Sequence, residues 1–261
     1  QLDLLSSDQV QALSTGQVRA LTTAQVGGMA AAQITNLSSV QVQALTTAQL
    51  NALGLEAVQG MGTADVQALT TTQVSSMGTA DVNELSSDQV QALTTAQVQA
   101  LTTTQLGAVA PRQLTMLGSA QVASLSAEQL TALTGDGIRA LDVTDLLAIS
   151  PEKVGAFGSD FLNQLSGHQM AGLDGEFLRA ISTQVLADMS TQQLAQLSWE
   201  QVQAFSGDQL QSFSPAQRTG MGIGPLTFGG NTNDTLVGGF GNDMMYGLGG
   251  DDRLDGQAGS D

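Results

Sequence analysis

Apolar residues recur at every eighth position over most of this chain. The series begins at Leu5, ends at Met221 and contains only apolar residues, without an insertion or deletion. A second apolar series lies five positions later in each octad, from Val10 to Leu210, and it fails at Arg218. One continuous helix does not fit this period, because eight residues turn by about 800° and the apolar stripe would wind around the axis. A half-buried strand does not fit either, because strict alternation of apolar and polar residues is missing.

The position after each residue of the first series indicates where a helix begins. It holds Ser, Thr, Gly or Asp in every octad except two, which have Ala30 and Ala110. Ser, Thr and Asp side chains cap helix N-termini, and Gly is also accepted there. The next position carries Pro111, Pro151 and Pro215, and Pro is tolerated at the first helical residue. Gln, or less often Asp, two positions further on completes a capping box, and the two apolar series form hydrophobic staples. The pattern therefore predicts that each octad is a capped helix of about two turns.

Such helices must be stabilised by their neighbours, because isolated helices need roughly 12–15 residues to be stable. We therefore expect a mainly α fold in which residues 1–221 form an α-solenoid of very short helices. The alternative is a β-solenoid with rows of Thr on one face, and the positions of the prolines count against it. The rows of Gln and Thr have two interpretations: they are solvated helix caps, or they pair neighbouring chains laterally. From about residue 134 the octads become less regular, as terminal repeats of solenoids often do.

A different period of nine follows the octads. Residues 222–228 read as a linker, rich in Gly and containing Pro225. The units are GGNTNDTLV at 229–237, GGFGNDMMY at 238–246, GLGGDDRLD at 247–255 and the partial GQAGSD at 256–261. They match the pattern G-G-x-G-x-D-x-U-x, in which U is a large apolar residue. This segment resembles the RTX family of type I-secreted bacterial proteins, and the resemblance implies a small parallel β-roll over residues 229–261.

The residue types in these units suit Ca²⁺. Glycines let the backbone turn with positive φ and let carbonyl groups approach an ion, and Asp supplies the hard oxygen ligands that Ca²⁺ prefers. The apolar residues Leu236, Met245 and Leu254 are expected to point into the roll. The departures from the pattern are Thr232, Leu248 and Gln257.

The resemblance further implies that each calcium ion is shared between turns two repeats apart. Carried over, this pairs Asp234 with Asp252 and Asp243 with Asp261, and carbonyl groups of the turns complete each shell. The predicted metal ligands are these four aspartates together with Gly229, Asn231, Asn233, Gly238, Phe240, Asn242, Gly247, Gly249 and Asp251.

Composition narrows the function further. The formal net charge is −17, which argues against binding nucleic acid or anionic membrane surfaces. There is no cysteine, so disulfides and thiolate metal sites are excluded, and no apolar run is long enough to span a membrane. His168 is the single histidine and Lys153 the single lysine, and neither belongs to a catalytic motif. We therefore expect this chain to have no enzymatic activity of its own.

These observations together favour a secreted protein that acts outside a bacterial cell or at its surface. The first hypothesis is an extracellular structural protein that self-assembles, head to tail or laterally, into calcium-stabilised filaments or biofilm-matrix fibres. The alternative is a rod-like spacer of a large RTX adhesin that attaches cells to surfaces or matrix components. Both ends of the sequence fall within a repeat, so we expect further octads upstream and a secretion signal downstream.

Overall fold

A computed structural model of the chain describes residues 5–259. The chain divides into two compact units, residues 1–149 and residues 150–261, and each is described by itself. The described residues form 27 short helices followed by four short strands. The predicted fold class, an array of short helices followed by a small parallel β region, is confirmed.

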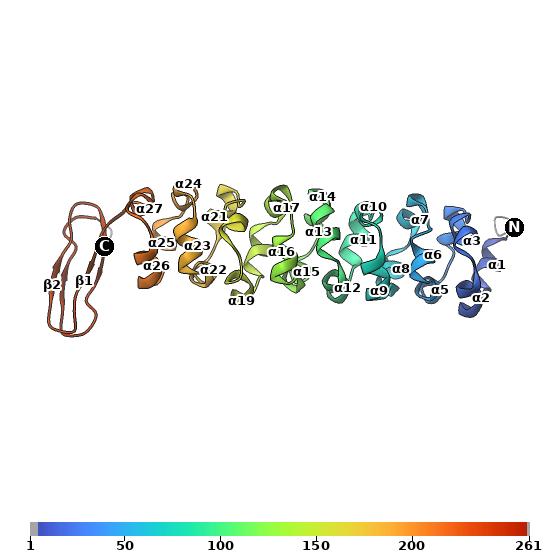
Figure 1. Cartoon of the computed structure of the whole chain (residues 1–261), viewed down its shortest axis with the longest axis horizontal. Coiled ribbons are helices and arrows are strands. Elements are labelled where there is room, and N and C mark those ends of the chain that lie inside the picture. The colour runs from blue at the N-terminus through green and yellow to red at the C-terminus, as the bar shows by residue number, and fades with distance from the viewer. Residues whose placement is uncertain (1–4, 260–261) are drawn as a thin grey trace. The chain divides into compact units, whose positions relative to one another are not determined.

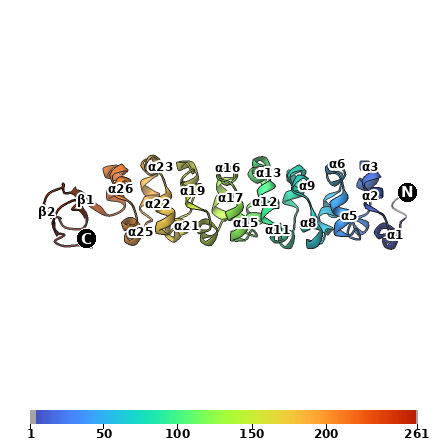
Figure 2. The same cartoon turned by 90° about the horizontal axis from the view of Figure 1, so that it is seen from below.

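The first unit contains eighteen helices of four to six residues each, and Figures 1 and 2 show them running from blue to yellow-green. They are α1 (Ser7–Gln11), α2 (Thr15–Ala20), α3 (Thr23–Gly27), α4 (Ala31–Ile34), α5 (Ser39–Ala44), α6 (Thr47–Leu50), α7 (Leu55–Gly60), α8 (Thr63–Ala68), α9 (Thr71–Ser76), α10 (Thr79–Asn83), α11 (Ser87–Ala92), α12 (Thr95–Ala100), α13 (Thr103–Ala108), α14 (Pro111–Leu114), α15 (Ser119–Ser124), α16 (Ala127–Thr131), α17 (Gly135–Ala140) and α18 (Val143–Leu147).

The second unit contains nine helices of the same kind and then the strands. The helices are α19 (Pro151–Val154), α20 (Ser159–Leu162), α21 (Gly167–Gly172), α22 (Gly175–Ala180), α23 (Thr183–Asp188), α24 (Thr191–Leu194), α25 (Trp199–Gln203), α26 (Gly207–Ser212) and α27 (Pro215–Gly220). The strands are β1 (Ile223–Phe228), β2 (Thr235–Val237), β3 (Asn242–Tyr246) and β4 (Arg253–Asp255).

The helices are shorter than the predicted two turns. The reason lies at the residue of the first apolar series, which ends one helix with an extended backbone and leads directly into the next cap. Leu45, for example, has φ −59° and ψ 138°, and the N-cap Thr46 has φ −71° and ψ 159°. Two extended residues in every octad leave at most six for the helix.

Helices three places apart along the chain pack against each other. The pairs α2 with α5, α5 with α8 and α8 with α11 show this in the first unit, and α20 with α23 and α23 with α26 show it in the second. Three octads therefore make one turn of the solenoid. Both apolar series face the interior of each turn, and in the first unit Leu50, Leu106, Leu125 and Leu130 are almost completely buried. Each such side chain contributes roughly 1.5–3 kcal/mol through burial.

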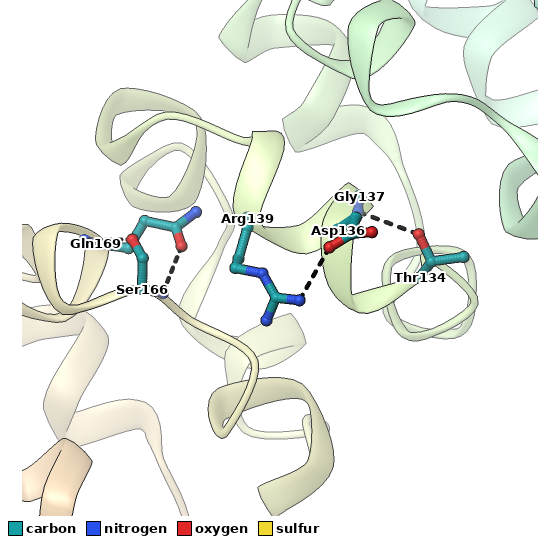
Figure 3. A network of polar contacts seen from close by, with 6 residues as sticks. All are labelled: Thr134, Asp136, Gly137, Arg139, Ser166 and Gln169. Atoms are coloured by element: carbon teal, nitrogen blue, oxygen red, sulfur yellow. Dashed lines mark hydrogen bonds and ion pairs between the residues drawn. The ribbon is translucent and has the colours of Figure 1, made fainter.

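The caps take the predicted form. At α12, the hydroxyl of Thr94 accepts from the backbone N–H of Gln97 at 3.2 Å, and the Gln97 Oε1 accepts from the N–H of Thr94 at 2.8 Å. Figure 3 shows a simpler cap in the first unit, in which Gly137 N–H donates to Thr134 Oγ1, and a Ser166–Gln169 cap in the second unit. It also shows the Arg139–Asp136 ion pair, 3.0 Å long, on the surface of α17.

The glutamines of the capping boxes also join one turn of the solenoid to the next. The side-chain amide nitrogen of Gln97 donates to the carbonyl groups of Val66 and Leu69 in the preceding turn, at 2.8 and 2.7 Å. Gln49, Gln73 and Gln105 repeat this arrangement at 28 and 31 residues' separation. One amide thus caps the N-terminus of its own helix and binds carbonyl groups at the C-terminus of another, where helical carbonyls run out of intrahelical donors.

This arrangement corrects both interpretations of the Gln row. Gln97 is only 2 % exposed, so it is neither solvated nor available to a neighbouring chain. In the first turn Gln9, Gln17 and Gln25 keep the cap, and their side chains are exposed. The Gln row is therefore an internal lattice between turns, while the Thr residues of the caps and first helical positions remain mostly on the surface.

The strands form two small parallel sheets. Strand β1 pairs with β3 and β2 pairs with β4, so each turn of the roll spans two nonapeptides. The residues predicted to be a linker, 222–228, contain β1, because 226–228 are in register with 244–246 and extend their sheet. Of the three residues expected to face inward, Leu236 is buried and Met245 is half-buried. Leu254, on the last described strand, is 49 % exposed.

Candidate functional site

Three aspartates lie where the Gly-rich turns of the roll meet the strands. Asp234 and Asp252 immediately precede β2 and β4, and Asp243 is the second residue of β3. Parallel pairing of Thr235 with Arg253 places the first two on the same side of the roll in successive turns. The nonapeptide period thus stacks two carboxylates along one side of the β2–β4 sheet, while Asp243 lies on the β1–β3 sheet.

The structure brings Asp234 and Asp252 together, as the resemblance implies. The backbone N–H of Asp234 donates to the Asp252 Oδ1 at 2.8 Å, and the Arg253 N–H donates to the Asp234 carbonyl at 2.8 Å. The Asp234 Oδ2 also accepts from the Gly230 N–H at 2.6 Å. Both carboxylates are therefore oriented by the backbone of the turns and need no other side chain to hold them.

The first glycine of each nonapeptide opens a space that oxygen atoms surround. A Cβ on Gly229 would lie 2.9 Å from the Asp234 Oδ2 and against the carbonyl oxygen of Gly247. A Cβ on Gly238 would lie 2.6 Å from the Asp243 Oδ2 and 2.8 Å from the Gly256 carbonyl oxygen. Any side chain at these positions would fill the space, which explains why the units begin with glycine.

Asp243 is the most buried of these carboxylates, with 4 % of the residue exposed. Its Oδ2 accepts from the Gly239 N–H at 2.6 Å, and its Oδ1 lies close to the position that a Cβ on Gly224 would take. Its predicted partner, Asp261, lies outside the described residues. The Asp243–Asp261 pair therefore stays a prediction.

The other predicted ligands are arranged around these turns. The Asn233 side-chain oxygen accepts from the Asp251 N–H at 2.9 Å, and Asn231 lies against Gly249. Phe240 forms an isolated parallel bridge with Ala258, while its side chain is 96 % exposed, so it can contribute only its backbone to a site. Asn242 begins β3, opposite Ile223, and Gly247 lies against the Asp252 carboxylate.

Sequence reasoning missed the part that β1 plays. Pro225, two nonapeptides before Asp243, stands where a nonapeptide strand would carry its aspartate. Strand β1 thus covers one end of the β3 sheet without adding a carboxylate. The Phe228 and Tyr246 rings stack at 5.2 Å, and burial raises the pKa of the Tyr246 hydroxyl. The signal available in the sequence was the apolar Leu226 and Phe228, two nonapeptides before Met244 and Tyr246.

Comparison with known families agrees with this geometry. Residues 228–261 match the RTX calcium-binding nonapeptide repeat, in four copies. This segment is a calcium-binding repeat. Residues 5–39, 58–95 and 74–111 match the ALTTAQ repeat, a family to which sequence reasoning had not assigned the octads. No curated protein matches the chain.

The residues of the RTX segment fit Ca²⁺. The groups that converge on the turns are carboxylate, amide and carbonyl oxygens, and Ca²⁺ takes six to eight such ligands. No cluster of three or more His, Cys, Asp or Glu side chains occurs within residues 5–259, and backbone carbonyl oxygens such as those of Gly247 and Gly256 lie beside the aspartates. A site built in this way depends on glycines at the turns as much as on the aspartates.

Nothing comparable gathers elsewhere in residues 5–259. His168 is exposed in the first turn of α21, away from any cluster of acids. Both matched families are repeat families, which are typically structural rather than catalytic. Among the described helices, none is long and apolar enough to cross a membrane.

Proposed function

We propose that this chain belongs to a secreted extracellular structural protein that self-assembles into calcium-stabilised filaments or matrix fibres. RTX repeats occur in secreted bacterial proteins, and this one follows an array of ALTTAQ repeats, a repeat family of the kind that is typically structural. The proposal rests above all on the repeated interface between turns. Every turn presents the same pattern of caps, amides and apolar side chains. A surface that packs against the next turn of the same chain can therefore also pack against the equivalent surface of another copy, which suits assembly.

The calcium-binding segment would make assembly depend on the calcium concentration. The nonapeptides from 229 to 261 contain six aspartates and one arginine, so the segment carries a net charge of about −5 at neutral pH. Without a cation, neighbouring carboxylates in successive turns repel one another. Calcium is scarce in the cytosol and plentiful outside, so the segment would order, and favour assembly, only after export.

Electron microscopy of the purified chain in negative stain, with millimolar Ca²⁺ and with a chelator, tests the proposal. We expect regular fibres with Ca²⁺ that disperse on chelation. The Asp234→Asn/Asp252→Asn double variant should require more Ca²⁺ for assembly, whereas Asp255→Asn, on strand β4 beyond the turn, should behave as the wild type. Protein that stays monomeric at high concentration with millimolar Ca²⁺ would overturn the proposal.

The spacer of an RTX adhesin is the second candidate. The observation that favours it is the hydrogen bonding in both directions between turns. Gln41 donates back to Leu13 across 28 residues, and Arg19 Nε donates forward to the Ala44 carbonyl across 25. Such a lattice resists bending, as a spacer requires. Unassociated particles of constant length in both conditions would support this candidate.

A further inference from the structure

Three octads per turn sort the octads of the first unit into three columns of stacked helices. One column consists of α3, α6, α9, α12 and α15, each packed on the next. We call its surface the uncharged face. Its octads contain no Asp, Glu, Lys, Arg or His, and they are residues 21–28, 45–52, 69–76, 93–100 and 117–124.

The charged residues of the same turns are confined to the other two columns. Most of them are acidic, and three of the exposed ones, Asp88, Glu128 and Asp136, lie in the first turns of their helices. The full set between residues 5 and 140 is Asp8, Arg19, Glu56, Asp65, Asp81, Glu84, Asp88, Arg112, Glu128, Asp136 and Arg139. The segregation becomes a continuous face only through the fold, because the octads of this column are every third one along the sequence.

The uncharged face exposes only a few kinds of chemical group, and it stops at the next helix of its column. Its exposed positions are Thr hydroxyl and methyl groups, Ala methyl groups and a few amides, as at Thr23, Ala48, Thr71 and Thr95. A hydroxyl group both donates and accepts hydrogen bonds, so such a surface is complementary to itself. The next helix of the column is α18, where Asp142 and Asp145 form the cap and end the uncharged face.

We propose that the uncharged face binds a second copy of this chain side by side. All charged residues in the column of α1, α4, α7, α10, α13 and α16 are acidic, so contact through it brings carboxylates together. The column of α2, α5, α8, α11, α14 and α17 carries charges of both signs, so contact through it requires their desolvation. Contact through the uncharged face avoids both costs, and charged residues are depleted in the cores of protein interfaces. The inference deepens the proposed function and rests on it, since it names the surface through which assembled copies meet.

Disulfide cross-linking gives a direct test, because the chain contains no cysteine. Thr71 lies near the middle of the uncharged face, so in a two-fold contact it lies close to the same residue of the other copy. Thr63 occupies the equivalent first helical position of α8, in another column, and is likewise exposed. We expect Thr71→Cys to form covalent dimers at least about ten times faster than Thr63→Cys under oxidation of the full-length chain. Equal rates would overturn the inference.

Charge substitutions on the same face provide a second measurement. Glutamate at the first helical position is favourable for the helix itself, so Thr71→Glu/Thr95→Glu should remain folded. Thr63→Glu/Ser87→Glu adds the same charge to another column. Sedimentation velocity should show self-association of the wild type and the control pair, and its loss in the Thr71/Thr95 pair. Equal association in both variants would contradict the inference.

The two experiments can tell a failure of this inference from a failure of the proposed function. Lateral association through the uncharged face needs no roll, so the cross-link at residue 71 should form with a chelator present as well. Calcium-dependent fibres without preferential cross-linking at residue 71 would overturn the inference and leave the function standing. Cross-linking at residue 71 without calcium-dependent fibres would support the face and overturn the calcium-dependent function.

Discussion

The octads and the nonapeptides join their successive turns through different chemical groups. Both are repeats whose turns must satisfy backbone groups in the adjacent turn. In the octads a side chain does so: Gln97 caps α12 and also donates to Val66 and Leu69 one turn away. In the nonapeptides the turns gather oxygens instead, as at Asp234, Asp252 and Gly247, and such groups are the ligands that Ca²⁺ prefers.

The two regions therefore differ in what stabilises their folded state. The octads bury two apolar residues per eight and hold few charges, so they depend on nothing outside the chain. The nonapeptides bury little, since Val237 and Leu254 are about half exposed, and they concentrate acidic groups. Folding of the second region should therefore be coupled to metal binding while folding of the first is not.

Removal of calcium should have the largest effect of all, and this effect should be confined to the nonapeptides. With a chelator, amide hydrogen exchange in β2, β3 and β4 should lose its protection, because repulsion among the aspartates is no longer compensated. The helices α8 to α15 should keep theirs. Hydrogen exchange read by mass spectrometry distinguishes the regions within one sample. Loss of protection in both regions at once would show that they fold as one.

A single carboxylate should account for much of that effect. Asp252→Ala removes the group that lies beside Asp234 in the next turn, and we expect calcium affinity at that side of the roll to fall at least about tenfold. Isothermal titration with Ca²⁺ measures the change. Asp255→Ala is the matched control and should change the affinity little, because this exposed carboxylate contacts only Arg253, at 3.8 Å, and the Gln257 N–H, at 3.3 Å, among the described residues.

Loss of a lattice glutamine should weaken the octads. Gln97→Ala leaves the Leu69 carbonyl and the N–H of Thr94 without partners and removes one of the two donors to the Val66 carbonyl, which should destabilise the array by about 2–4 kcal/mol. Gln25→Ala removes only a cap, since no bond from its amide to another turn is present among the described residues, and should cost about 1 kcal/mol. Urea unfolding followed by circular dichroism compares the two. Equal losses would mean that the bonds between turns contribute nothing.

The smallest effect should come from placing a glutamine at a position of the Gln row that holds an aspartate. Asp81 stands at the Gln position of α10, and burial raises the pKa of its carboxyl. Asp65 and Asp145 occupy the same position but accept from Ser39 and Ser119, 26 residues before them, whereas Asp81 has Leu55 there. Asp81→Gln should reach the carbonyls of the preceding turn and stabilise the array by about 1 kcal/mol at pH 7.

The dependence on pH gives an independent check of that exception. Burial also raises the pKa of Asp145, so at both sites the folded state binds protons more tightly than the unfolded chain does. Their contribution is fully present below the ordinary value of 3.8 and is lost as the pH rises through the raised values. Acidification from pH 7 should therefore increase the contribution of these two sites, whereas Asp142, whose pKa is lowered by its hydrogen bond from the Thr144 hydroxyl, contributes in the opposite direction. Because Asp142 is unchanged in the variant, Asp81→Gln should respond less favourably to acid than the wild type. An unchanged slope in the variant would contradict this account.

Much of the fold could be predicted from the sequence because the signals are local. The caps at Thr94 and Thr134, the prolines at first helical positions and the nonapeptide aspartates depend only on residues close by in the chain. The pairing of Asp234 with Asp252 came from the family resemblance, and the parallel register agrees with it. The strand at 223–228 was missed because its partner lies two nonapeptides away and Gly and Pro mask its pattern.

By itself the sequence determined the octad, its caps, its buried apolar series and the calcium-binding character of the last units. Only the tertiary structure decided that three octads make a turn, because an eight-residue period does not reveal how successive helices close around an axis. That closure turns the Gln row inward, where each amide joins two turns, and gathers the uncharged octads into one face. Both results depend on contacts between successive turns, such as those from Gln97 to Val66 and Leu69, which local propensity cannot encode.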